Sequence, residues 1–409
     1  MKLAGGSEVQ MQSYGTVLRC RMCRAEYAPV KERVLCACGQ PLEQEYDLAG
    51  VASLGKSSIE RTRTRGIWRY APLLPVRVPG DAASLGEGGT PMFLLRHTSR
   101  DLGIDLFLKD EGQNPTGTFK ARGGSVGVAR LRELGWRSLA MPTVGSGGSA
   151  WAAYAAQLSV RMKVGLPTEP NLPVVGLEEP RLYGAEVDQL PFPRETAFSK
   201  MKETLPPDTL YVGGFSEPYR LEGEKTILYE IAEDLGWRLP DFVFWPTGGG
   251  VGLVGLAKAA SELGELGWVQ SSSDMTVVSA QHESGAPIAA ALHRGHGGAI
   301  PSAGHADGLA PGATHGAPFA GDYILARVRN TVRADGVVGS DDAIRETMKA
   351  VAARDGALLC PEGALAVAGA IQMTRGGDIP KGATVVCVNT ATGHRYPRVI
   401  AQLSSGLIG

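Results

Sequence analysis

The sequence predicts an α/β fold in which parallel strands alternate with helices. Short apolar runs typical of buried strands recur along the chain, and most precede segments whose apolar residues have helical spacing. Such alternation is typical of a parallel sheet with helices on both faces. The composition agrees, because 43% hydrophobic and 20% charged residues are normal for a globular protein, and 409 residues suffice for two or three domains.

The expected elements follow this alternation along the chain. Apolar runs bounded by turn residues predict strands at 92–95, 104–108, 138–143, 161–166, 185–187, 241–246, 275–280 and 384–388. Helical spacing predicts helices at 120–134, 150–157, 177–183, 195–205, 219–237, 285–292 and 341–353. The polar stretch 47–64, rich in Ser and Gly, is interpreted as a linker.

Charge and hydropathy exclude several classes of partner. The net charge is −1, so no basic field points to nucleic acid or to a membrane surface. No apolar run is long enough to span a bilayer. The first residues, Met1–Glu8, lack the apolar core of a signal peptide. We therefore expect a cytoplasmic protein that acts on a small molecule.

Four of the six cysteines lie in the first forty residues: Cys20, Cys23, Cys36 and Cys38. Two thiolate pairs separated by a hairpin-length loop suit tetrahedral zinc, although one residue rather than two separates the second pair. We expect residues 1–50 to form a zinc-ribbon-like segment with a structural Zn²⁺, because four cysteines leave no open coordination position. The alternative is four reduced cysteines packed against the main domain.

One lysine stands at the boundary between a loop and a helix. The turn Asn114–Gly117 breaks the chain, and the helical pattern begins close to Lys120. An amine at a helix N-terminus faces a positive dipole, which disfavours the ammonium form, and partial burial acts in the same direction. A neutral lysine is a nucleophile. The alternative is a solvated lysine in the first turn of a helix.

Two glycine-rich loops enter helices and present free N–H groups there, which suit anions. The first loop suits an amino-acid carboxylate and consists of Thr143, Val144, Gly145, Ser146, Gly147, Gly148 and Ser149. Alternatively, it is a capped turn with Ser149 as the N-cap.

The second glycine-rich loop suits a phosphate and contains Gly248, Gly249, Gly250, Val251 and Gly252. No lysine completes a P-loop there. The spacing Gly250-x-Gly252-x-x-Gly255 also matches a dinucleotide fingerprint, without a convincing acidic partner, so a nicotinamide-dependent oxidoreductase is an alternative.

The C-terminal half holds further candidates. The long segment 294–322 is predicted to be a loop near the substrate mouth, and its histidines His296, His305 and His315 are predicted to be solvated. Glu362 is either an active-site carboxylate or a dipole partner in the first turn of a helix. The strand at 384–388 runs into Thr390 and Thr392, which end a strand of buried type.

Several short motifs of this sequence resemble those of one known family. Lys109–Gly112, Asn114–Gly117 and Phe119–Gly123 resemble the lysine segment of fold-type II pyridoxal 5′-phosphate (PLP) enzymes, closest to the long-form threonine synthases. The resemblance implies that Lys120, beside Phe119, holds PLP as an internal aldimine. It assigns the cofactor phosphate to residues 248–252. It also implies a structural zinc ribbon at the N-terminus.

The resemblance also assigns the remaining contacts. The 143–149 loop would bind the substrate carboxylate, and Ser146 stands where the family has an asparagine that contacts the ring hydroxyl. Thr390 would face the pyridine nitrogen of the cofactor. If the match to the family motif is displaced by two residues, Thr392 would face it instead. A neutral hydroxyl there leaves that nitrogen largely unprotonated. Glu362 belongs to a short motif that, in the family, lies near the cofactor ring.

The implied architecture is two parallel-sheet α/β lobes with PLP in the cleft between them. The smaller lobe would comprise residues 96–218 and the larger one 51–95 with 219–409. We expect a homodimer. The implied reaction converts O-phosphohomoserine and water to threonine and phosphate. Because of Ser146, β- or γ-replacement on another activated amino acid is an alternative, and a non-catalytic protein that binds through its cysteine ribbon is a further one.

Overall fold

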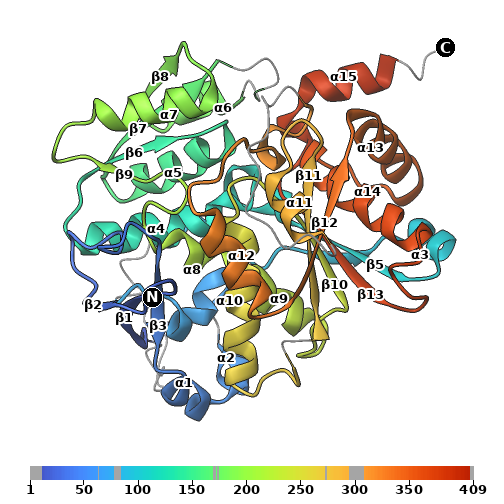
Figure 1. Ribbon diagram of the computed structural model, residues 1–409, viewed down its shortest axis with the longest axis horizontal. Helices are drawn as coiled ribbons and strands as arrows, with labels where there is room; N and C mark the ends of the chain where they lie inside the picture. The colour runs from blue at the N-terminus through green and yellow to red at the C-terminus, as the bar shows by residue number, and fades with distance from the viewer. Residues whose placement is uncertain are drawn as a thin grey trace, which may run out of the picture.

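The computed structural model describes residues 12–62, 64–77, 84–168, 172, 175–271, 274–293 and 308–405. Two sheets form its framework (Figure 1). The larger sheet has the order β12 (Arg333–Gly339), β11 (Thr276–His282), β10 (Phe242–Pro246), β13 (Thr384–Asn389), β5 (Asp105–Asp110), β4 (Met92–Leu94). The smaller has the order β8 (Glu186–Leu190), β7 (Arg161–Pro167), β6 (Ser138–Pro142), β9 (Leu210–Tyr211). All neighbours in both sheets are parallel except β4 and β5, which confirms the predicted fold class.

The larger sheet is buried on both faces. Successive side chains of a strand point to opposite faces, so Val243 and Trp245 of β10 pack in one cluster and Phe244 packs in another. The first cluster contains residues of α1 (Leu48–Leu54), α2 (Lys56–Arg61), α9 (Thr226–Asp234), α10 (Val251–Glu265), α11 (Pro287–Leu292) and α12 (Gly321–Arg329). The second contains residues of α13 (Asp341–Asp355), α14 (Pro361–Arg375) and α15 (Pro397–Ser405), with α3 (Arg96–Leu102) packed beside them. Burial on both faces explains why these strands read as continuous apolar runs.

The smaller sheet has its own core. Its helices are α4 (Lys120–Glu133), α5 (Ser146–Gln157), α6 (Val175–Leu182) and α7 (Arg194–Glu203). The short helix α8 (Arg220–Glu224) lies against both α4 and α10. Trp151 of α5 is 1% exposed and packs in the same cluster as Val128 of α4 and Val164 of β7. None of the described helices has the length and apolarity to cross a lipid bilayer.

Three expectations need correction. The presumed linker 47–64 contains α1 and α2, which dock on the larger core through the buried Val51 and Ile59. Two apolar contacts among polar residues are too few to produce a helical pattern. The expected helix 219–237 is divided into α8 and α9 at Lys225. Finally, β5 pairs with β13 and β4, so the expected smaller lobe, residues 96–218, wrongly includes a strand of the larger sheet. The sequence near β5 could not show this, because β5 and its partner β13 are hundreds of residues apart.

The N-terminal strands β1 (Gly15–Cys20), β2 (Glu26–Tyr27) and β3 (Leu42–Tyr46) form an antiparallel sheet (Figure 1). Leu18 and Leu42 pack in the core of the smaller sheet, and Tyr46 packs in a core cluster of the larger one. Tyr46 Oη donates to Glu222 Oε2 of α8 at 2.9 Å, and Lys258 of α10 lies 2.6 Å from Glu222 Oε1. Glu43 accepts from Tyr323 Oη and pairs with Arg327 of α12. Burial raises the pKa of Glu43, but the cations around it, Arg327 first, outweigh burial and hold it at about 2.

A buried ion-pair cluster joins the lysine segment to the larger lobe. Arg122 of α4 pairs with Glu111 through Nε and Nη2 at 2.7 and 2.8 Å. The same guanidinium pairs with Glu230 of α9 through Nη1 and Nη2 at 2.8 and 2.7 Å. The side chains of Arg122 and Glu111 are 0% exposed and that of Glu230 is 1% exposed. Removal of one partner therefore leaves charges that water does not reach.

We predict that Arg122→Met lowers the free energy of unfolding by about 3–5 kcal/mol, because the buried Glu111 loses its cation and the buried Glu230 keeps only Lys109. Chemical denaturation measures the change. Arg161→Ala is the control, since Arg161 forms an ion pair with Asp208 but its side chain is 71% exposed, and we expect a change below about 1 kcal/mol. Equal effects of the two variants would contradict a special role for the buried cluster.

Candidate functional site

Lys120 begins α4 directly after a tight turn. Thr116 and Gly117 both adopt left-handed backbone conformations, with φ of 60° and 65°. The next residues are then fixed on the end of β13, because Phe119 N and Thr118 Oγ1 donate to the carbonyl of Thr390 at 3.0 and 3.2 Å. The loop-to-helix position predicted for Lys120 is confirmed.

The amine of Lys120 lies in a largely apolar environment with one anion. Its Nζ is 3.0 Å from Glu224 Oε1 of α8 and 4.0 Å from the centre of the Phe119 ring. Burial lowers the pKa of Lys120 and outweighs the opposing effect of Glu224. The charge of Arg220 acts in the same direction as burial. The direction expected from the sequence is therefore correct.

The second glycine-rich loop connects β10 to α10. Gly250 is the N-cap of α10 and has φ of 88°, and a Cβ on Gly250 would lie 2.6 Å from Ile324 Cδ1. A Cβ on Gly248 would lie 2.5 Å from the carbonyl oxygen of Gly312. Within the described chain, the backbone N–H groups of residues 248–250 donate to no other backbone group. These free donors and the positive end of a 15-residue helix suit a phosphate.

A cavity of about 210 Å³ brings most of the predicted site residues together. Those that line it are Phe119, Lys120, Thr143, Ser146, Gly147, Gly248, Gly249, Gly250, Val251, Gly252, Glu362 and Thr390. Gly145, Gly148, Ser149 and Thr392 are not among the lining residues. The hydroxyl of Ser149 instead accepts from Arg395, and that of Thr392 accepts from the backbone N–H of His394.

The loop before α5 is shaped by Thr143 rather than by Ser149. Thr143 Oγ1 accepts from the backbone N–H groups of Gly145 at 3.1 Å and of Gly148 at 3.4 Å. The helix begins at Ser146 with Gly145 as its N-cap, so the alternative with Ser149 as N-cap is wrong. Ser146 therefore stands in the first turn of α5, at the wall of the cavity.

Glu362 and His315 also line the cavity. Glu362 is 4% exposed and lies in the first turn of α14, where it also faces the cavity. Its Oε1 accepts from Tyr396 Oη at 2.9 Å and from Gly312 N at 3.0 Å, whereas Oε2 is buried without a partner among the described residues. Burial raises the pKa of Glu362. Burial lowers that of His315 to about 4, so this imidazole is neutral at pH 7.

Several site residues were not predicted from the sequence. His315 was expected in solvent, which is wrong; His296 and His305 lie outside the described residues. Arg194 of α7, Arg220 of α8 and Tyr396 line the cavity, and Glu224 lies behind Lys120. Glu224 belongs to the short segment Leu221–Thr226, which also resembles the family, but the segment itself indicates no role for its side chains.

The comparisons with known proteins agree with this geometry. A family model described as "Pyridoxal-phosphate dependent enzyme" matches residues 83–391. The chain belongs to this family. It is a PLP enzyme of fold type II, as the lysine segment predicted. Family membership argues against the nicotinamide-dependent alternative, because the glycine run that suggested it lines the same cavity as Lys120.

Two archaeal threonine synthases are similar over nearly their whole length. The chain is 32% identical over 387 residues to the enzyme of Methanocaldococcus jannaschii, with 94% of each chain covered. It is 31% identical over 390 residues to that of Methanosarcina acetivorans, again with 94% covered. Threonine deaminase isoform 2 from Solanum lycopersicum has the same fold, with a TM-score of 0.62, 22% identity and coverage of 81% of this chain and 90% of the deaminase.

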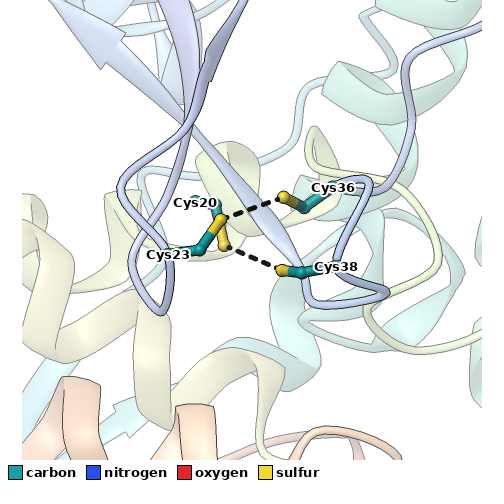
Figure 2. A group of neighbouring side chains, drawn as sticks. All are labelled: Cys20, Cys23, Cys36 and Cys38. Carbon is teal, nitrogen blue, oxygen red and sulfur yellow. Dashed lines mark hydrogen bonds between the residues drawn. The ribbon is translucent and has the colours of Figure 1, made fainter.

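The PLP enzyme carries a second site in its N-terminal sheet. The sulfur atoms of Cys20, Cys23, Cys36 and Cys38 all lie within 4.8 Å of one another. Figure 2 shows two contacts between these sulfurs, which are 3.4 Å for Cys23 with Cys36 and 3.7 Å for Cys20 with Cys38. Four sulfurs that bind one zinc tetrahedrally at about 2.3 Å would be about 3.8 Å apart. The cluster has the dimensions of a metal site.

We predict that Gly250→Ala weakens the retention of PLP at least about tenfold, because a side chain at this left-handed residue strains the turn by about 1–3 kcal/mol and meets Ile324. Visible absorption after dialysis measures the bound cofactor. Gly236→Ala is the matched control, since Gly236 has φ of 70° and open space around its Cβ position. Equal retention of PLP by both variants would contradict the role of the loop.

Proposed function

We propose that this PLP enzyme is a lyase that converts O-phosphohomoserine and water to threonine and phosphate. The observation that supports the proposal best is one cavity lined by Lys120, the glycine loop and Thr390 in a chain 32% identical to a threonine synthase over 94% of its length. When bound, PLP supplies an electron-accepting ring that stabilises negative charge on the substrate α-carbon.

The residues of the chain have separate tasks in this proposal. The N–H groups of residues 248–252 would bind the cofactor phosphate, and Thr390, at the end of β13, would supply a hydroxyl to the ring nitrogen. Lys120 would hold the cofactor covalently until the substrate amine displaces it, and its freed Nζ would then take the proton from the substrate α-carbon. Ser146 and Gly147, at the start of α5, bind the substrate carboxylate.

The charges around the cavity favour a substrate with a second anionic group. Arg194 and Arg220 line the cavity and are each 6% exposed, and Arg220 also pairs with Glu217 through Nε at 2.7 Å. Arginine suits phosphate recognition because its planar group donates several hydrogen bonds in a fixed geometry. Burial raises the pKa of Glu362, so in this proposal its carboxyl group donates a proton to the leaving group or to the reacting substrate.

Replacement on another activated amino acid is the second candidate. Ser146 lines the cavity where the family has an asparagine, and a serine hydroxyl does not reach as far as an amide. The two candidates differ in the group that leaves and in the nucleophile that adds.

We predict that the PLP-loaded enzyme releases phosphate and threonine in equal amounts from O-phosphohomoserine. Lys120→Ala should lose both this activity and the visible absorption of bound cofactor, because it lacks the amine that binds PLP. Phosphate release and amino-acid analysis measure the products. No turnover of O-phosphohomoserine together with activity on an acylated serine or homoserine would reject the threonine synthase reaction and support the second candidate.

We also propose that the four-cysteine cluster binds one structural Zn²⁺. We predict that Cys38→Ser, at an exposed ligand position, loses about one zinc per chain, because a structural zinc site needs four ligands. Elemental analysis by mass spectrometry measures the metal. Cys387→Ala is the control, since Cys387 is buried in β13, and it should keep its zinc. Wild-type protein without zinc, purified with no chelator, would refute the assignment.

A further inference from the structure

Glu224 is the one carboxylate that touches the amine of Lys120 in the described part of the chain. It ends α8, its side chain is 1% exposed, and its Oε1 lies 3.0 Å from Lys120 Nζ. It does not line the cavity, so it meets Lys120 from behind rather than from the substrate side. Its second oxygen, Oε2, is buried and has no partner among the described residues.

Two glycines allow this contact. A Cβ on Gly223 of α8 would lie 2.0 Å from the carbonyl oxygen of Arg122, which no side chain tolerates. A Cβ on Gly123 of α4 would lie 3.1 Å from the carbonyl oxygen of Arg220 and 3.2 Å from Glu224 Oε1. The backbones of α4 and α8 therefore meet at the position where Lys120 and Glu224 face each other.

Two other glutamates of the same segment, Glu217 and Glu222, differ from Glu224 because both oxygens of each carboxylate have partners in the fold. Glu222 uses both oxygens, with Lys258 on Oε1 and with Tyr46 and Lys225 on Oε2. Glu217 also uses both, with Arg220 Nε on Oε1 and the N–H of Tyr219 on Oε2. Glu224 has no partner besides Lys120 among the described residues, so its charge acts on that amine alone.

We propose that Glu224 is the positioning residue of Lys120, whose carboxylate orients the lysine nitrogen at the cavity wall and stabilises the proton that this nitrogen receives. The inference depends on the proposed function, because it assumes that Lys120 moves a proton. In that step the C–H bond of the substrate breaks, an N–H bond forms on Lys120, and the resulting ammonium pairs with Glu224. The proton leaves the same nitrogen when it returns to the substrate or product.

The remaining charged groups near Lys120 do not replace Glu224. Arg220 on α8 is a cation and opposes protonation of the amine. Across the cavity lie Arg194, the neutral His315, and Glu362, whose Oε1 is held by Tyr396 and Gly312. Without the Glu224 charge, the local field around Lys120 is therefore dominated by cations and by apolar surface.

The test uses PLP-loaded Glu224→Gln, which keeps the size and an oxygen acceptor but loses the charge. The visible absorption of the bound cofactor is titrated with pH, and kcat and KM for the amino-acid substrate are measured. We expect the spectral transition to move to lower pH by about one unit or more, because an anion within hydrogen-bond distance of the nitrogen is lost. We expect kcat to fall about 10- to 100-fold with KM nearly unchanged, since the lysine is less well placed.

Glu203→Gln is the matched control, because Glu203 also lies 3.0 Å from a lysine, Lys200, but on the exposed surface. It should leave the spectrum and both kinetic constants unchanged. A folded Glu224→Gln enzyme with the spectral titration and kcat of wild type would overturn the proposal. If Lys120→Ala kept the visible absorption, the proposed function would fail instead, so the two failures are distinguishable.

Discussion

The buried contact of Arg122 with Glu111 and Glu230 supports the rest of the site. It joins the end of β5, the start of α4 and the helix α9, which are distant in sequence. Lys109 of β5 adds a second buried contact to Glu230 of α9, at 3.1 Å. Because burial of three charges is costly, the main effect of the cluster is to select one arrangement of these three elements rather than to add stability. Because Arg122 follows Lys120 by two residues, this contact determines where the lysine enters the cavity.

The cavity lies where the carboxyl ends of strands from both sheets meet, which is the usual ligand position of open α/β sheets. β10 leads into the glycine loop, β13 into Thr390, and β6 into the loop of Thr143. The helices α5 and α10 begin at this point, and their free N–H groups favour anions. The cavity thus combines anion-binding backbone with one poorly solvated lysine.

The N-terminal sheet extends the same network rather than standing apart from it. Tyr46 of β3 and Lys258 of α10 both contact Glu222, two residues before Glu224. The segment with the four cysteines is therefore joined by direct contacts to the helix that faces Lys120 and to the helix that carries the glycine loop. A metal in the cluster would secure this connection at its outer end.

The sequence by itself indicated the fold class and singled out Lys120, the glycine loop 248–252 and the four cysteines, because each depends on residues close together in the chain. Only the tertiary structure placed Thr390 and His315, but not Thr392, at the cavity wall and turned Ser149 toward Arg395. It alone brought Glu224 to Lys120, across 104 residues. Such contacts depend on helix crossings and strand pairing between distant segments, and local spacing carries no information about them.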